Sequence, residues 1–305
     1  MLNIWRLKLL VQFQTLGTMQ RVSEMMHTSI AAVSQQLNLL EKETNLILFE
    51  KVGRRMQLTP EGQSLVNKIR PVLNQLESIE NSLTDTSEEV QGTVRIAVFT
   101  SALEKVVIPA VSQLSQLYPK LQIRLTEMEP DISLPALDAY QFDLAIVAYS
   151  EKPHLLEQSH RKVIKLGHDR LRVLVSDKNP IAKQSHIGIE SLKAQNWVLE
   201  PDGTYLCEYT KNLCRSAGYE PNVINVVQSY LSMHSMIAQD LAIGILPTLA
   251  IIESIQGIHM IDLQPEPTRD IYLVARKNTT TTRAMKIVMD TLCHRCQSIV
   301  DLCHE

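Results

Sequence analysis

Residues 17–37 read GTMQRVSEMMHTSIAAVSQQL, and they are the most informative part of the chain about its amino-terminal structure. Two helical patterns, over residues 19–26 and from Ser29 to about Glu43, are joined by a tight polar turn. The second pattern carries small residues and amides on the face opposite its apolar stripe. Such a helix can enter the major groove of DNA, because nothing bulky blocks its approach and amides can reach base edges. The stretch therefore predicts a helix-turn-helix.

The flanking residues complete a winged helix-turn-helix over residues 1–59. An amphipathic helix over 2–16 ends at Gly17, and two extended runs, 46–52 and 56–59, flank a turn that contains Gly53. Glutamine side chains suit adenine, and the guanidinium groups of a hairpin tip suit phosphate or a narrow minor groove. The predicted DNA contacts are Thr28, Ser29, Ile30, Ala32, Ser34, Gln35, Gln36, Asn38, Lys51, Arg54 and Arg55.

A long helix is predicted to follow, in a linker over residues 60–91. Thr59 is a suitable cap and Pro60 suits the first helical position. Apolar residues then recur at steps of four and three, which is typical of a helix that packs along another helix. The predicted dimerisation stripe consists of Leu65, Ile69, Val72, Leu76, Ile79 and Leu83.

From Gly92 onward strand and helix patterns alternate, which predicts parallel sheets covered on both faces. The alternation divides residues 92–305 into two lobes, about 92–163 plus 269–305, and 164–268. Small molecules bind in a crevice at the carboxyl ends of such strands, where hydroxyls and backbone N–H groups suit an anion. The candidate effector contacts are Thr100, Ser101, Tyr149, Ser150, Thr204 and Ser229, several of which are equally suited to capping a helix.

Composition places the chain among ordinary globular proteins. It has 305 residues, 45% of them hydrophobic, and a formal net charge of -3. Residues 1–60 contain seven Lys/Arg against four Asp/Glu, so the predicted DNA-binding part is the basic one. Five cysteines, an odd number, and no segment that reads as an export signal or a membrane span favour the cytoplasm. We find no catalytic motif and expect no enzyme.

The whole pattern resembles the LysR-type transcriptional regulator family. The resemblance rests on the segments 17–19, 29–37, 40–41, 48–50, 54–55 and 58–62, and further on 92–96, 118–119 and 142–146. It implies an α/β protein with an N-terminal all-α winged helix-turn-helix, a long linker helix and a two-lobed, periplasmic-binding-protein-like effector domain. It also implies a homodimer or homotetramer on double-stranded DNA, with a small-molecule effector, here expected to be anionic, that modulates DNA binding or promoter activation. The chain departs from the family pattern at Ser29-Ile30-Ala31 and Ser34-Gln35-Gln36.

Two alternatives stay open. The first is a thiol-based redox-sensing regulator, because Cys207 and Cys214 lie near the positions of the redox pair in peroxide-sensing family members. On a continuous helix, however, the two Cα atoms are about 10 Å apart, beyond the roughly 7 Å limit for a disulfide. The second alternative is a solute-binding module that does not act on DNA, which the two lobes of residues 92–305 would also suit. The winged helix-turn-helix over residues 1–59 counts against this alternative. Cys293, Cys296 and Cys303 are interpreted as packing the last helix, so no metal or cofactor is expected.

Overall fold

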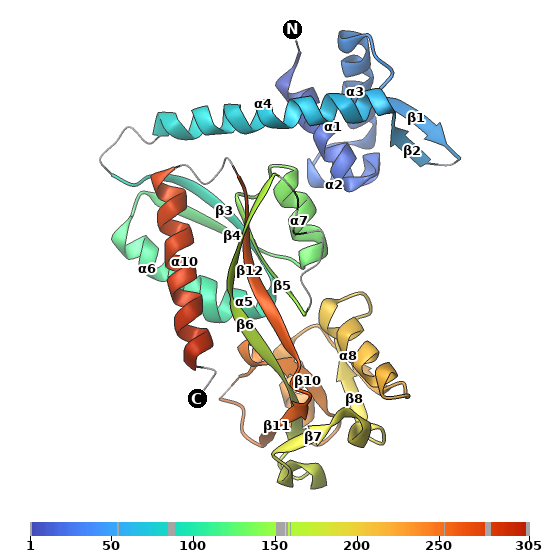
Figure 1. Cartoon of the computed structure of the whole chain (residues 1–305), viewed down its shortest axis with the longest axis vertical. Helices are drawn as coiled ribbons and strands as arrows, with labels where there is room; N and C mark the ends of the chain where they lie inside the picture. The colour runs from blue at the N-terminus through green and yellow to red at the C-terminus, as the bar shows by residue number, and fades with distance from the viewer. Residues whose placement is uncertain are drawn as a thin grey trace.

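A computed structural model describes residues 2–53, 55–84, 89–150, 156, 158, 160–252, 254–277 and 282–302. Along its longest axis lie a helical head, a first lobe and a second lobe, with the long helix α4 crossing above the first lobe (Figure 1). Among the described residues, no helix combines the length and the apolar character needed to cross a bilayer.

The head consists of α1 (Ile4–Leu16), α2 (Met19–Met25), α3 (Ile30–Thr44) and a hairpin of β1 (Phe49–Val52) and β2 (Arg55–Leu58). Each helix begins at a side-chain cap: Asn3, Thr18 and Ser29 accept hydrogen bonds from backbone N–H groups of the first turn. Gly17 ends α1 at a φ of 76°, a left-handed conformation that favours glycine. The head core includes Leu10, Val11, Val22, Val33, Leu37, Leu40 and Leu48.

Helix α4 (Pro60–Thr84) contributes to the head core with its first turns. Thr59 Oγ1 accepts a hydrogen bond from Gly62 N at 3.0 Å and donates one to Ile47 O at 2.7 Å, which joins the helix start to the wing. A Cβ on Gly62 would lie 2.4 Å from Leu48 O, so only glycine permits this close approach.

The predicted dimerisation stripe therefore divides between two environments. Ile69 is only 4% exposed and belongs to the chain's own head core, and Leu65 and Leu76 pack against that core. The expectation that these three face a partner needs correction, because α1 already covers that side of α4. Val72 and Ile79 are 52% and 51% exposed. Leu83 is in the helix, but its side chain lies outside the described residues.

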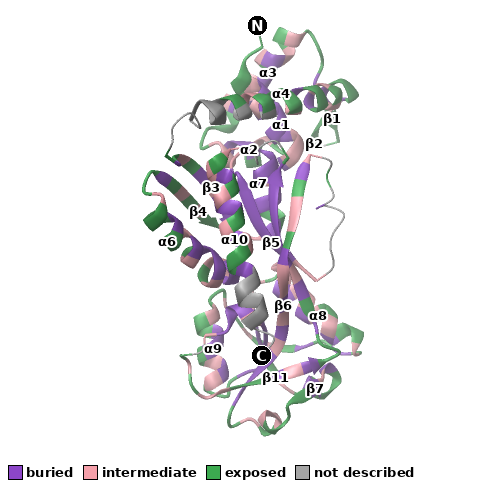
Figure 2. Ribbon diagram, turned by 60° about the vertical axis from the view of Figure 1, so that its left-hand side comes forward, coloured by how far each residue is buried: buried purple, intermediate pink, exposed green. Residues whose placement is uncertain are grey.

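The first lobe is built on β3 (Gly92–Val98), β4 (Leu121–Glu127), β5 (Leu144–Tyr149), β12 (Thr268–Arg276) and the first part of β6 (Arg161–Ser176). Alternate strand residues face opposite sides. One face packs on α5 (Thr100–Ala102), the π-helical turn η1 (Leu103–Val107), α6 (Ile108–Leu117) and α10 (Arg283–Leu302), and the other on α7 (Pro130–Asp138). These helices enclose buried strands (Figure 2).

The second lobe is built on the rest of β6 with β10 (Gly244–Pro247), β11 (Ile258–Gln264) and β7 (His186–Gly188). A parallel pair, β8 (Asn196–Leu199) and β9 (Asn222–Val226), adjoins it with α8 (Tyr205–Ser216) and α9 (Tyr230–Ala238). Short 3-10 turns are η3 (Pro180–Lys183), η4 (Ile189–Leu192) and η5 (Thr248–Ala250). Trp197, fully buried, lies in the core of this lobe.

The main sheet is mixed, so the prediction of purely parallel sheets was wrong. Strands β4 and β5 pair with β3 in parallel, whereas β12 is antiparallel to β5 and β6, and β10 and β11 are antiparallel to β6. The cause is β6, a 16-residue strand that pairs with β12 up to Arg170 and with β10 and β11 beyond it. In the first half of β6, charged residues interrupt the apolar ones, so the sequence showed no pattern of a buried strand there.

Candidate nucleic-acid interface and inter-lobe crevice

The exposed face of α3 carries most of the predicted DNA contacts. Val33, Leu37 and Leu40 turn the opposite face into the head core. Ser29 Oγ accepts a hydrogen bond from Ala32 N at 3.1 Å and so defines where the helix begins. The exposed members of the set are Thr28, Ser29, Ile30, Gln35 and Asn38, and the partly exposed ones are Ala32, Ser34 and Gln36. The face is largely polar, and no other described part of the chain covers its exposed residues.

Gln36 has a structural partner within the head. Its Oε1 accepts a hydrogen bond from Arg6 Nε at 2.9 Å, and the Arg6 guanidinium also pairs with Glu43. This bridge holds α1 against α3. A side chain bonded in this way is less free to reach a base than the exposed amide of Gln35.

The wing is held in a defined position beside α3. Glu41 Oε1, on α3, accepts hydrogen bonds from Leu48 N at 2.8 Å and from Phe49 N at 3.2 Å. At the tip, Gly53 has a φ of 63°, and Lys51 and Arg55 are exposed. Arg54 lies outside the described residues. A carboxylate that fixes the wing by two backbone bonds is a positioning element that the sequence analysis did not identify.

The second candidate site lies where β6 and β12 pass between the lobes. Arg269 and Asp169 are directly opposite each other on these strands, both almost fully buried, with Nη2 and Oδ2 at 2.7 Å. Arg269 Nη2 also donates to Ser101 Oγ at 2.7 Å, and its guanidinium lies 4.9 Å from the centroid of the Phe99 ring. Asp169 Oδ1 accepts from Leu249 N at 3.2 Å. The arginine is thus neutralised and held on several sides.

Beside Arg269 is a cavity of about 10 Å³, bounded by both lobes. A volume of this size holds about one water molecule, so the crevice is closed in this structure. The hydroxyls of Ser150 and Tyr205 hydrogen-bond across it. Its lining consists of Phe99, Glu129, Pro130, Ala148, Glu200, Tyr205, Leu206, Tyr230 and Arg269.

The predicted effector residues border this cavity without lining it. Phe99, Ala148, Tyr205 and Tyr230 are chain neighbours of Thr100, Tyr149, Thr204 and Ser229 respectively. Thr100 Oγ1 donates to Glu127 Oε1 at 2.6 Å, and Thr204 Oγ1 donates to Pro201 O at 2.9 Å. Ser101 Oγ accepts a hydrogen bond from Arg269, and Ser229 is the exposed cap residue of α9. The segments that contain these residues therefore border the cavity, and the side chains of Thr100, Thr204 and Ser101 are hydrogen-bonded to other groups of the chain.

Two carboxyl groups that the sequence analysis missed face the cavity, one from each lobe. Glu129 directly precedes α7, and Glu200 directly follows β8. Burial, and next the carboxylate of Glu200, raise the pKa of Glu129 from 4.5 to about 7. Burial likewise raises the pKa of Glu200, to which Tyr230 is hydrogen-bonded. Their places at a helix start and a strand end were a usable signal, since such positions border crevices in α/β folds.

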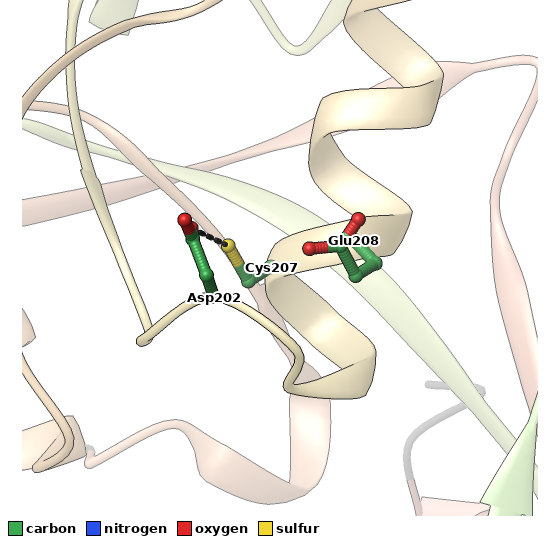
Figure 3. A group of neighbouring side chains, drawn as sticks. All are labelled: Asp202, Cys207 and Glu208. Carbon is green, nitrogen blue, oxygen red and sulfur yellow. Dashed lines mark hydrogen bonds between the residues drawn. The ribbon is translucent and has the colours of Figure 1, made fainter. Parts of the chain in front are cut away.

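Cys207 is the thiol on which a redox function would depend. Figure 3 shows it between Asp202 and Glu208, with Cys207 Sγ 3.7 Å from Asp202 Oδ1. The ligand atoms of these three residues lie within 4.8 Å of one another, but Asp202 is already paired with Lys211 at 2.5 Å. Cys207 is buried, and burial raises its pKa, which disfavours the reactive thiolate.

The second cysteine of that pair is also buried. Cys214 lies two turns along the same helix α8, and burial raises its pKa as well. Seven residues of helix separate the two Cα atoms by about 10 Å, beyond the reach of a disulfide. Near the carboxyl end, Cys296 is buried in the first-lobe core and Cys293 packs against it, while Cys303 lies outside the described residues.

Comparison with known families matches both parts of the chain. Residues 4–63 match the model of the bacterial regulatory helix-turn-helix protein of the lysR family, and residues 87–297 match that of the LysR substrate binding domain. The second match alone covers more than half of the chain.

Individual relatives are distant but extend over the full length. A hydrogen peroxide-inducible genes activator of Haemophilus influenzae is 24% identical over 98% of this chain and 99% of its own. Full-length OxyR from Pseudomonas aeruginosa, solved as a point variant, has a TM-score of 0.65 at 19% identity, covering 96% and 95% of the two chains. Full-length CbnR, solved in complex with its target DNA, has a TM-score of 0.52 at 17% identity, covering 97% and 99%. At these identities the structural likeness concerns the fold.

Proposed function

Because this chain belongs to the LysR family of transcriptional regulators, we propose that the exposed face of α3 reads an operator in double-stranded DNA under the control of a small molecule in the crevice. Membership makes it a DNA-binding regulator with an effector-binding domain and not an enzyme. The observation that carries the proposal is the capped, uncovered polar face of α3 beside a wing that Glu41 holds in position. Such a regulator acts in the cytoplasm, where the chromosome lies.

A gel-shift assay with genomic fragments, run at moderate salt, tests DNA recognition. We expect preference for a few fragments over bulk DNA, since base contacts add to the non-specific affinity for phosphates. Equal affinity for all fragments would favour the alternative, a solute-binding module that does not act on DNA. The matched control is a head variant with charge reversed at the wing, Arg55→Glu, which should lose most affinity at the same salt.

The crevice favours an effector that carries a positive charge or donates several hydrogen bonds. Glu129 and Glu200 bring two acidic groups to it, whereas its cation, Arg269, is already neutralised by Asp169. An anionic effector, expected from Thr100 and Ser101, finds no support in these contacts. An incoming amine or guanidinium would stabilise both carboxylates. The crevice has to open to admit it, so the effector acts by its different affinity for the open and closed forms.

Thermal-shift measurements on the full-length protein test this chemistry. A panel of small amines and guanidines is compared with carboxylates of matched size at pH 7.5. We expect only the cationic series to raise the melting temperature, and we expect the increase to be lost in Glu200→Gln. Stabilisation by the carboxylates alone would contradict the proposed effector class and leave DNA recognition unaffected.

We further propose that the chain forms a homodimer or homotetramer through α4. Val72 and Ile79, each about half exposed, lie on the side of the helix that the head leaves uncovered. Two such helices packed against each other would bury these side chains. An oligomer also presents two heads to DNA, which suits an operator with two half-sites.

Peroxide sensing is the second candidate, since several relatives are hydrogen peroxide-inducible genes activators. The burial of the Cys207 thiol, which raises its pKa, and the separation of Cys207 from Cys214 count against peroxide sensing. If peroxide changes DNA binding in the wild type but not in Cys207→Ser, the redox function is supported. If the two proteins respond alike, it is excluded. Cys293→Ser is the matched control.

A further inference from the structure

Helix α7 connects the crevice with the DNA-binding head of the same chain. Its amino end begins at Glu129 and Pro130, which line the crevice. Its carboxyl end leads into the turn at residues 139–141, which lies against α1 and α2 (Figures 1 and 2). The two regions that the proposed function requires to communicate are therefore joined by nine helical residues.

Three hydrogen bonds join this turn to α1, α2 and α4, the first two in the head and the third in the helix whose first turns pack against it. Gln12 Nε2, on α1, donates to Ala139 O at 3.3 Å. Gln141 Nε2 donates to Met25 O, at the end of α2, at 3.2 Å. Tyr140 Oη donates to Arg70 O, on α4, at 3.2 Å. The groups bonded to the turn belong to three different helices, α1, α2 and α4. The turn therefore constrains the orientation of the head relative to the first lobe as well as the distance between them.

Apolar packing accompanies these bonds on both sides of the contact between the 139–141 turn and the head, which we call the seam. Met25 of the head packs against the lobe cluster that includes Leu134 and Leu137 of α7. In return, Tyr140 of the lobe packs against the head core. Gln12 is only 4% exposed, so its polar end is enclosed between the two parts. The contact therefore consists of side chains from each part packed into the core of the other.

Several contacts hold the turn in its conformation. Tyr140 adopts a left-handed φ of 64°, and the buried guanidinium of Arg276 lies 4.7 Å from its ring centroid. Arg276 Nη1 also donates to Leu137 O at 2.6 Å and to Phe142 O at 2.5 Å, on either side of the turn. We therefore expect a displacement of α7 to be passed on to the turn, because the packing around it leaves little room to absorb the movement.

We propose that α7 is the mechanical link by which the state of the crevice sets the orientation of the DNA-binding head in its own chain. The inference rests on the proposed function for what the crevice binds. The contact leaves the exposed face of α3 uncovered, so it controls where the head points and does not block DNA. A ligand that separates Glu129 from Glu200 moves the start of α7, and the 139–141 turn carries the head with it. Packed interfaces of this kind change between discrete arrangements.

The first test is amide hydrogen exchange of the full-length, DNA-free protein. Two variants remove one seam bond each, Tyr140→Phe and Gln141→Ala. We expect about fivefold faster exchange in residues 19–28, as the loss of one hydrogen bond implies, with the melting temperature of the lobes retained. Gln122→Ala, an exposed glutamine on β4, is the matched control and should exchange as the wild type does. Wild-type rates at 19–28 in both seam variants would overturn the proposal.

The second test perturbs the crevice and observes the head. Glu129→Gln alters the crevice end of α7 without touching any head residue, and Glu104→Gln is its exposed control in the same lobe. We expect Glu129→Gln to change exchange at residues 19–28 at least about twofold, and we expect Tyr140→Phe to abolish that response in the double variant. Unchanged rates at 19–28 in Glu129→Gln, whatever happens at residues 197–206, overturn the link. DNA preference is measured separately by gel shift, so loss of that property would count against the proposed function alone.

Discussion

At the scale of single residues, base reading and phosphate contact are assigned to different side chains. Gln35 is exposed on α3, whereas the neighbouring Gln36 is bonded to Arg6. Gln35→Ala should relax base preference at one operator position by about 1–3 kcal/mol and leave affinity for other sequences nearly unchanged. Gel shifts across single-base operator variants at fixed salt measure this. Gln75→Ala, an exposed glutamine of α4, is the control.

Arg55 on the wing should behave differently. Arg55→Ala is expected to weaken binding to all sequences alike and to reduce the slope of log affinity against log salt by about 1, because one phosphate contact is lost. Titrations at several salt concentrations measure the slope. If Arg55→Ala and Gln35→Ala produce the same pattern over operator variants, the assignment of their roles is incorrect.

Glu129 predicts a pH dependence of stability. Its pKa in the folded protein is raised from 4.5 to about 7, so the folded state holds this proton more tightly than the unfolded state does. The resulting stability is present below about pH 4.5 and is lost as the pH rises through about 7. Glu129→Gln should therefore melt at a higher temperature than the wild type at pH 8 and show a smaller difference at pH 5. An equal difference at both values would contradict the raised pKa.

At the scale of elements, α4 has two sides with different tasks. Val72→Lys and Ile79→Lys place charges on half-exposed positions, so we expect the oligomer to dissociate while the head stays folded. Ile69→Lys instead buries a charge in the head core and should unfold the head. Sedimentation combined with circular dichroism separates the two effects. An unchanged sedimentation profile in the double variant of Val72 and Ile79 would rule out this side of α4 as the interface.

In the molecule as a whole, the buried pair Asp169–Arg269 lies between the lobes, where β6 and β12 pair in antiparallel fashion. Asp169→Asn leaves the buried guanidinium of Arg269 without its counter-charge, at a cost of about 3–5 kcal/mol. Because β6 continues through both lobes, we expect a single unfolding transition at a lower temperature. Asp177→Asn, an exposed position after β6, is the control. Calorimetry that shows one lobe unfolding at the wild-type temperature would contradict joint stabilisation by this pair.

Local signals in the amino-acid sequence were sufficient to predict several helices and strands. Caps at Thr18 and Ser29, the glycine turns, and the apolar stripe of α3 all act within a few residues of themselves, so the winged helix-turn-helix could be predicted closely. The same holds for strand β4 and helix α8, whose periodicity is uninterrupted. In each case the pattern states which face is apolar.

What each apolar face packs against became known only from the three-dimensional arrangement of the elements. The pattern of α4 did not distinguish Ile69, which the head core covers, from Val72, which it leaves exposed. The sequence patterns elsewhere in the chain also did not indicate that β6 would join both lobes. Nor did they indicate that Glu129 and Glu200, far apart in the chain, would meet across a crevice. Local periodicity encodes the amphipathicity of an element, whereas partners distant in sequence are selected by the packing of the whole core, which no short window contains.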